Sequence, residues 1–203
     1  MARITKTIPE RHQEIIDTAS ILFIENGYDK TQISDIAKQM NVAQGLIYHY
    51  FKSKTELLYA VIDEMATEKQ KLLKSALNSS ESTALQKLIT LISLLSFKLN
   101  SSSFGKLIPS IANDAAIIEY CSNKMIASTL HVLTLLIKQG NLDGSWKCEH
   151  PDATAQFILR GFSGFFDISS SIDDRQEKKQ VLLDIIVRVL GEPGDPIDKQ
   201  GNL

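Results

Sequence analysis

Apolar residues recur at intervals of three and four along most of this sequence, which is the pattern of amphipathic α-helices. The first stripe includes Ile15, Ala19 and Phe23, and it predicts a helix that starts near Pro9 and ends at the Asn26-Gly27 pair. No segment shows the strict alternation of apolar and polar residues that a half-buried strand requires. The sequence therefore predicts an all-α fold.

Two short helices separated by a tight turn are expected next. Ile33 and Ile36 lie on the buried face of the first helix, for which Thr31 would be the N-cap. Asn41 follows, and asparagine tolerates the left-handed backbone conformation of a tight turn. The second helix should run from residue 44 to residue 51 and turn polar and aromatic side chains toward phosphates and base edges. The outward residues are Gln44, Gly45, Tyr48 and His49, and Tyr50 completes a row of three polar-tipped aromatic residues.

A long fourth helix is predicted from Ser53, which can form a capping box with Glu56, to Leu77. The segments that follow are helical in pattern and are separated by polar breaks. The expected helices cover residues 83–99, 104–118, 120–139, 152–171 and 175–190.

Composition narrows the class of protein. The chain has 203 residues, 43% of them hydrophobic, and a net charge of −2, which argues against nonspecific coating of nucleic acid but permits a local DNA-reading face. No apolar run reaches the length of a membrane helix, and the N-terminus lacks the apolar core of a signal peptide. Two cysteines fit free thiols in a reducing compartment. We expect a cytoplasmic protein with no membrane partner.

A resemblance to a known family rests on the N-terminal quarter of the chain. The matching residues are Ala19–Phe23, Asn26–Tyr28, Thr31, Ile33, Asp35–Ala37, Val42, Gly45, Ile47–Tyr48, Tyr50–Phe51, Ser53–Lys54 and Glu56–Leu58. In order and spacing they resemble the tetracycline-repressor (TetR) family of bacterial transcription regulators. The chain departs from the family pattern at Asn41, often glycine, and at Ala43, often serine or threonine.

The resemblance implies about nine helices in two domains. Residues 1–54 would form a three-helix domain with a helix-turn-helix, residues 55–191 a ligand-binding and dimerisation domain, and residues 192–203 a flexible tail. It also implies a homodimer on a palindromic double-stranded DNA operator. Residues at family DNA-contact positions are Thr31, Gln44, Gly45, Tyr48, Tyr50 and Lys54.

Two further residues of the second short helix complete the DNA-binding candidates. Leu46 can offer only an apolar contact, such as one to a thymine methyl group. His49 is either a phosphate ligand or an ordinary exposed histidine. For Tyr48 and Tyr50 the alternative is packing against the fourth helix.

Aromatic and soft side chains between residues 83 and 170 could line a pocket for an effector. The candidates are Phe97, Phe104, Tyr120, Met125, His131, Trp146 and Phe162. Because this region has no cluster of Arg or Lys, and we expect only Arg160 to reach inward, the predicted effector is a mostly apolar small molecule. The alternatives are ordinary core residues, a hydrogen-bonded His131 within the core, and a fully packed domain without a cavity.

The end of the last predicted helix, residues 181–190, is apolar nearly all round, so one side should face a second subunit. Large apolar residues of the last two helices are the interface candidates. They are Phe162, Phe165, Phe166, Leu182, Ile186 and Val189.

Catalytic and metal sites are not expected. Cys148-Glu149-His150 lacks the spacing of a metal site, and no nucleophile elbow, phosphate loop or carboxylate pair is present. We therefore predict no cofactor, no metal and no enzyme. The leading hypothesis is a ligand-responsive repressor released from its operator by a small molecule. The alternative is a protein that binds or sequesters a small molecule and has merely retained the N-terminal domain.

Overall fold

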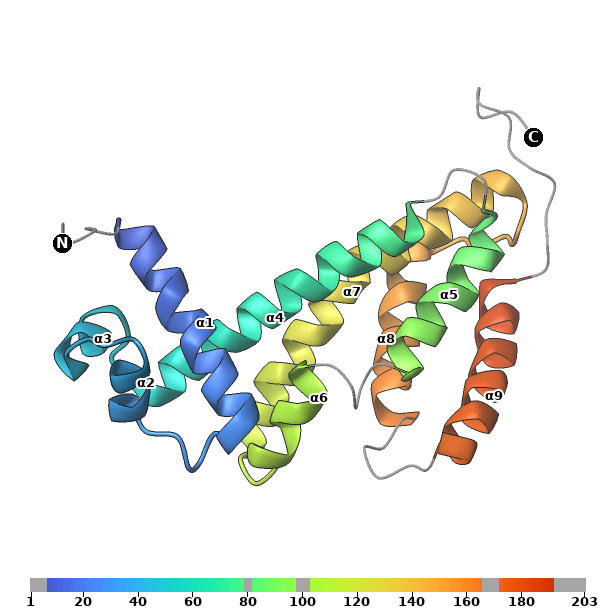
Figure 1. The fold of residues 1–203 in the computed structure, drawn as a ribbon. Coiled ribbons are helices and arrows are strands. Elements are labelled where there is room, and N and C mark those ends of the chain that lie inside the picture. Colours follow the sequence, from blue (N-terminus) through green and yellow to red (C-terminus); the bar gives the residue numbers. More distant parts are fainter. Residues whose placement is uncertain (1–6, 79–81, 98–102, 166–171, 192–203) are drawn as a thin grey trace. The chain divides into compact units, whose positions relative to one another are not determined.

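The computed structural model describes residues 7–78, 82–97, 103–165 and 172–191 of the chain (Figure 1). All regular structure within these residues is helical, which confirms the predicted all-α fold. The elements are α1 (Ile8–Asn26), α2 (Ile33–Gln39), α3 (Gln44–Tyr50), α4 (Lys54–Leu77), α5 (Ala84–Phe97), α6 (Ser103–Leu107), the 3₁₀ helix η1 (Ile108–Ser110), α7 (Ala115–Asp143), α8 (Pro151–Phe165) and α9 (Ile172–Leu190).

The chain forms two compact units. The first unit contains Met1–Met65 and Ser102–Cys121, and the second contains Ala66–Ser101 and Ser122–Leu203. The long helices α4 and α7 each contribute one part to each unit. Residues 1–6 and the predicted tail 192–203 lie outside the described residues.

The first unit is built on the predicted apolar stripes. Phe23 of α1, Ile36 of α2 and Ile47 of α3 are completely buried, and α1 also contacts α6. Thr7 caps α1 and forms a capping box with Glu10, while Pro9 occupies the first turn as predicted. A short helix gains little stability from its own hydrogen bonds, so this shared core is what holds α2 and α3 in place.

The first unit extends beyond the predicted boundary at residue 54. Leu57, Leu58, Val61 and Ile62 of α4 are completely buried, and the unit continues to Met65. The predicted cap of α4 is present, because the Glu56 amide donates to Ser53 Oγ at 3.0 Å. A domain boundary at the start of α4 would expose this apolar stripe.

The second unit has its own apolar core. Helices α5, α8 and α9 pack together, and the core also includes parts of α4 and α7 and the α7–α8 connection. Its buried members include Leu77, Leu91, Leu133, Trp146, Ile158 and Ile186. Helix α5 is not buried on every side, because Leu85 and Ile89 are 40% and 42% exposed. No helix among the described residues is both long enough and apolar enough to cross a membrane.

The middle of the chain differs from the predicted helices. The single helix expected over residues 104–118 is replaced by α6 and η1, because Pro109 cannot continue an α-helix. Helix α7 then begins earlier than expected, since the Asp114 carboxylate accepts hydrogen bonds from the Ala116 and Ile117 amides.

The helix predicted over residues 120–139 also ends later than expected, because α7 continues to Asp143. The Asp143 carboxylate accepts a hydrogen bond from the Ala84 amide at 2.8 Å and so ties the end of α7 to the start of α5. Position 140, inside α7, requires a glycine because the Trp146 ring packs directly on the backbone there. A β-carbon at Gly140 would come within 2.0 Å of that ring, whose Nε1 donates to the Ile137 carbonyl at 2.9 Å.

Gly140→Ala is expected to destabilise the second unit by about 3 kcal/mol, because the buried indole would have to leave its site. Chemical unfolding followed by circular dichroism measures this change. Gly161→Ala is the matched control in α8, where no atom lies within 4 Å of the position a β-carbon would take. There we expect a gain of about 0.5–1 kcal/mol from helix propensity. Equal effects of the two substitutions would contradict the packing role of Gly140.

Candidate nucleic-acid interface

Helices α2 and α3 are joined by a tight turn that fixes their geometry. Asn41 has a φ of 53°, as predicted, and the Val42 amide donates to the Ala37 carbonyl at 3.0 Å. The first turn of α2 is closed by Asp35, whose carboxylate accepts from the Gln32 amide at 2.8 Å. This arrangement is a helix-turn-helix, in which the second helix is the one that enters a DNA groove.

Thr31 does not have either of its predicted roles. Gln32, not Thr31, is the N-cap of α2. The Thr31 side chain is 1% exposed, and its hydroxyl donates to the Leu22 and Gly27 carbonyls at the end of α1. A hydroxyl that is buried and already engaged cannot contact DNA, so Thr31 instead fixes the α1–α2 connection.

Helix α3 separates buried from exposed residues as predicted. Ile47 is completely buried, while Gln44, Gly45 and His49 are exposed and Tyr48 is 44% exposed. Apart from its chain neighbours and the backbone of its own helix, no atom of the described residues lies within 4 Å of the position a β-carbon would take at Gly45. The exposed face of α3 is therefore open around Gly45 and bordered by hydrogen-bonding side chains. We call Gln44, Gly45, Tyr48 and His49 the α3 face.

The remaining two candidates of α3 are less accessible. Leu46 and Tyr50 are half-buried. The Tyr50 ring lies 6.2 Å from His12 of α1 and 5.4 Å, edge-on, from His49. His12 also packs on Phe51 with ring centroids 4.8 Å apart. This contact of α1 with the end of α3 was not predicted, because the sequence pattern does not place a polar-tipped residue such as His12 on a packing face.

Lys54 contacts the α1–α2 connection in the absence of DNA. Its Nζ lies 4.2 Å from the centroid of the Tyr28 ring and donates to the Asp29 carbonyl at 3.3 Å. Burial lowers the pKa of the Lys54 amine, and the nearby Asp29 carboxylate partly offsets that effect. Tyr28 is itself held by Thr55, with the two hydroxyl oxygens 3.1 Å apart. The predicted DNA contact of Lys54 stays a prediction.

Lys54→Ala is expected to reduce the slope of log affinity against log salt by about 0.9 for each phosphate that the lysine neutralises. Filter binding to operator DNA over a salt series measures this slope. Lys52→Ala removes the same charge from an exposed neighbouring position and controls for net charge. A lower melting temperature with an unchanged slope would show that Lys54 serves the fold alone.

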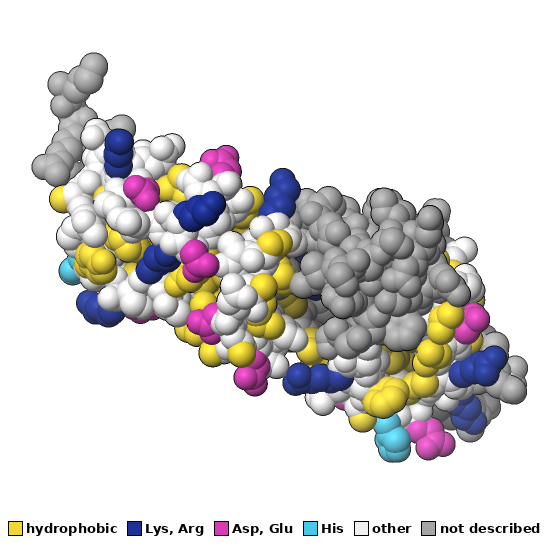
Figure 2. All heavy atoms as spheres, turned by 90° about the horizontal axis from the view of Figure 1, so that it is seen from below, with side chains coloured by type: hydrophobic (Ala, Val, Ile, Leu, Met, Phe, Trp, Pro, Cys, Tyr) yellow, Lys and Arg dark blue, Asp and Glu magenta, His cyan; other side chains and the backbone are white. Residues whose placement is uncertain are grey.

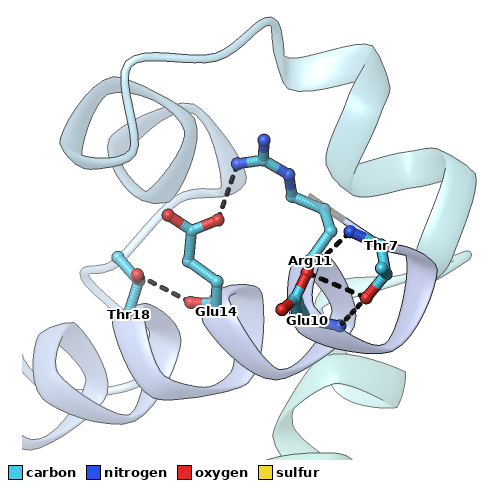
Figure 3. A network of polar contacts seen from close by, with 5 residues as sticks. All are labelled: Thr7, Glu10, Arg11, Glu14 and Thr18. Carbon is cyan, nitrogen blue, oxygen red and sulfur yellow. Dashed lines mark hydrogen bonds and ion pairs between the residues drawn. The ribbon is translucent and has the colours of Figure 1, made fainter. Parts of the chain in front are cut away.

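The first turns of α1 carry a polar network (Figure 3). The Arg11 guanidinium points toward Glu14 and donates to Oε2 at 2.6 Å, and the Thr18 hydroxyl donates to the Glu14 carbonyl. Because this ion pair neutralises Arg11, that residue is poorly suited to contact a phosphate. On the face of the molecule in Figure 2, basic and acidic side chains are interspersed rather than gathered by sign. On that face the described side chains therefore form no broad positive surface.

The effector-pocket candidates do not form one described cluster. Tyr120 belongs to the first unit, where its hydroxyl donates to Asp63 at 2.8 Å and its ring stacks on Tyr59 at 4.3 Å. Met125, His131 and Trp146 belong to the second unit. The side chains of the other candidates lie outside the described residues. These are Phe97, Phe104 and Phe162.

Three expectations about the pocket region were wrong. His131 is exposed, so it is neither a pocket residue nor a hydrogen-bonded core residue in the single chain. Trp146 is 3% exposed and packed on α7, which makes it a core residue. Arg160 is exposed and donates to Asn123 at 3.4 Å, so it does not reach inward.

The dimer candidates divide into two groups. Leu182 and Ile186 are 5% and 1% exposed and belong to the core of their own chain, which contradicts their assignment to an interface. Val189 is 39% exposed, and its interface role stays a prediction. Val181, Ile185 and Val187 are also exposed and were not among the candidates. The side chains of Phe162, Phe165 and Phe166 lie outside the described residues.

The cysteines do not form a reactive or metal-binding centre in the described part of the chain. Cys121 and Cys148 are both buried free thiols, and burial raises the pKa of Cys121 to about 11. Cys148 donates its thiol hydrogen to Thr154, and its amide donates to the Asn141 side chain. No group of three potential ligands occurs among the described residues.

Comparison with known proteins agrees with this geometry. The model of the tetR family of bacterial regulatory proteins matches residues 15–61. The fatty acid metabolism regulator protein of Bacillus subtilis is 46% identical over 54 residues, which are 27% of this chain and 28% of the relative. This N-terminal region of the chain is similar to the TetR family.

Two further similarities extend the comparison. The probable acrEF/envCD operon repressor of Escherichia coli K12 is 43% identical over 58 residues, 28% of this chain and 26% of the relative. These curated relatives are matched over only about a quarter of their length. The crystal structure of RolR with the ligand resorcinol covers 91% of this chain and 89% of that chain, with a TM-score of 0.70 and 17% identity. At this identity the similarity shows a shared fold alone.

Proposed function

We propose that this protein is a sequence-specific transcriptional repressor of the TetR family that binds a palindromic operator as a homodimer and leaves it when a small molecule binds. The observation that carries the proposal is the α3 face. Gln44, Gly45 and Tyr48 are exposed together on the second helix of a helix-turn-helix. An amide such as Gln44 can pair with both N6 and N7 of adenine in the major groove.

The exposed residues of α9 support the homodimer. Val181, Ile185 and Val189 recur at four-residue spacing and are 42%, 45% and 39% exposed. Such a stripe would bury apolar area against a second copy, as in a two-fold symmetric interface. Two subunits would present two α3 helices, which must lie about 34–36 Å apart to enter successive major grooves.

Helix α4, which contributes residues to both units, supports the proposed release by a ligand. Helix α4 is continuous from Lys54, which follows α3, to Leu77 in the core of the second unit. A ligand that binds one arrangement of the dimer more tightly would shift the population toward it. RolR was crystallised with resorcinol, and the Bacillus subtilis relative is named for fatty acid metabolism. Both names favour an effector with apolar surface.

The test is a gel shift with the DNA upstream of the protein's own gene, followed by footprinting. We expect protection of two half-sites about one helical turn apart. Gln44→Ala should cost about 1–3 kcal/mol at one base pair of each half-site and relax the preference there. A reduction that is uniform across operator variants would restrict Gln44 to backbone contacts.

A second candidate function is small-molecule binding or sequestration without DNA recognition. It shares the second unit but makes no use of the α3 face. Wild-type protein that binds upstream DNA no better than unrelated DNA, in moderate salt, would favour it over the repressor. Moderate salt matters because nonspecific phosphate contacts weaken steeply with ionic strength.

A further inference from the structure

One lysine of α4 lies on the side of the helix that faces the core of the second unit. Lys69 is three residues after Ala66 and four residues before Leu73, which are 6% and 4% exposed. Residues at these spacings share one face of a helix. Lys69 is accordingly half-buried, whereas Lys71 and Lys74 of the same helix are exposed.

The Lys69 amine has no counter-charge among the described residues. Within this part of the chain it makes no hydrogen bond or ion pair. Burial lowers the pKa of Lys69 to about 8, and no described carboxylate raises it. The amine is thus still mainly protonated near pH 7, although removal from water disfavours its charged form.

An unpaired ammonium group in apolar surroundings destabilises a fold, and a methionine would fill the same space without that cost. Exposed neighbours such as Lys71 show that α4 can direct lysines into solvent. A charged side chain that lowers stability can serve function where a bound ligand supplies the opposite charge. The neighbouring side chains on this face of α4 are apolar, so the ligand must combine a negative group with an apolar body.

We propose that Lys69 binds the carboxylate of an amphipathic small molecule whose apolar body packs against the second unit. The inference rests on the proposed function and assigns a chemical class to its effector. A single lysine balances the one charge of a carboxylate, whereas a phosphate carries more charge and usually needs several donors. The inference also revises the sequence-based expectation of an effector without a charge partner, because Lys69 lies outside the region from which that expectation was drawn.

Paired probes can test this assignment. Hexanoate, octanoate, decanoate and benzoate are compared with the corresponding alcohols by calorimetry and thermal shift on the full chain. At least one carboxylate should bind the wild type more tightly than its alcohol and raise its melting temperature. Lys69→Met should weaken carboxylate binding about ten- to a hundredfold, the effect of removing one charge-assisted hydrogen bond, and leave alcohol binding unchanged.

The matched control is Lys71→Met, which removes the same charge from an exposed position of α4 and should bind the carboxylate like the wild type. Lys69→Met itself should melt at the wild-type temperature or above, so weaker binding would not reflect unfolding. The inference is overturned if no carboxylate binds the wild type better than its alcohol. It is equally overturned if Lys69→Met retains wild-type affinity for the carboxylate.

A gel shift with the upstream DNA separates this inference from the proposed function. If a carboxylate binds through Lys69 but the wild type does not bind the DNA, or is not released from it, the assignment stands and the proposed repressor mechanism fails. If the DNA is bound and a neutral compound releases it with equal effect in the wild type and Lys69→Met, the mechanism stands and the assignment fails.

Discussion

Tyr48→Ala is expected to abolish specific operator binding while leaving the free energy of unfolding nearly unchanged. The Tyr48 side chain is 44% exposed on the second helix of the helix-turn-helix, so its removal opens no cavity in the core. The substitution should reduce operator affinity more than a hundredfold in the dimer, because each of two half-sites would forfeit about 1.5–3 kcal/mol from a hydrogen bond to a charged phosphate. A gel shift at fixed salt measures the change.

Gly45→Leu provides an independent test of the same face. The structure leaves the space around Gly45 empty, so a leucine there should be tolerated by the fold but should block close approach of α3 to DNA. Thermal melting of both variants at the wild-type temperature, together with disappearance of the gel shift, is the expected result. Wild-type operator affinity in both variants would remove the α3 face from the DNA interface.

Helical periodicity in the sequence predicted this face because α2 and α3 are short and each has a single buried side. It placed Ile47 inside and Gln44, Gly45 and Tyr48 outside, as the structure has them. The prediction was wrong at Thr31, a residue type that suits an N-cap. Thr31 is buried instead, and its hydroxyl donates to the Leu22 and Gly27 carbonyls. Those partners belong to the end of the preceding helix, and local sequence rules do not register contacts between elements.

Ile185→Asp is expected to prevent dimerisation, whereas Ile186→Asp is expected to unfold the chain, although the two residues are adjacent. Ile185 is 45% exposed, so an aspartate there should leave a folded monomer and prevent association through α9. Operator affinity should then fall by about a hundredfold or more, because two linked half-site contacts become independent. Analytical ultracentrifugation at micromolar concentration measures the change in mass.

Ile186 is 1% exposed in the core of its own chain, so Ile186→Asp would bury an unpaired carboxylate. We expect that variant to be destabilised by about 4 kcal/mol or more and to be largely unfolded. Circular dichroism distinguishes it from a folded Ile185→Asp monomer. A dimeric Ile185→Asp protein with wild-type operator affinity would exclude this stripe of α9 from the interface.

The sequence could show that α9 needs cover on two sides, but not which side faces the protein's own core. From Val181 to Leu190 its residues are apolar at nearly every position, so periodicity does not distinguish Ile185 from Ile186. The same limit applies to the second unit as a whole. Residue type alone groups His131 with Trp146 as pocket candidates, yet the first is exposed and the second is fixed in the core.

The aromatic residues are divided between the two units in a way that has an optical consequence. All five tyrosines, Tyr28, Tyr48, Tyr50, Tyr59 and Tyr120, belong to the first unit, and the single tryptophan, Trp146, belongs to the second. Selective excitation of the indole therefore monitors the second unit alone in the unlabelled protein. Tyrosine emission reports the first unit, so the order in which the two units lose structure during denaturation can be recorded without introducing a probe.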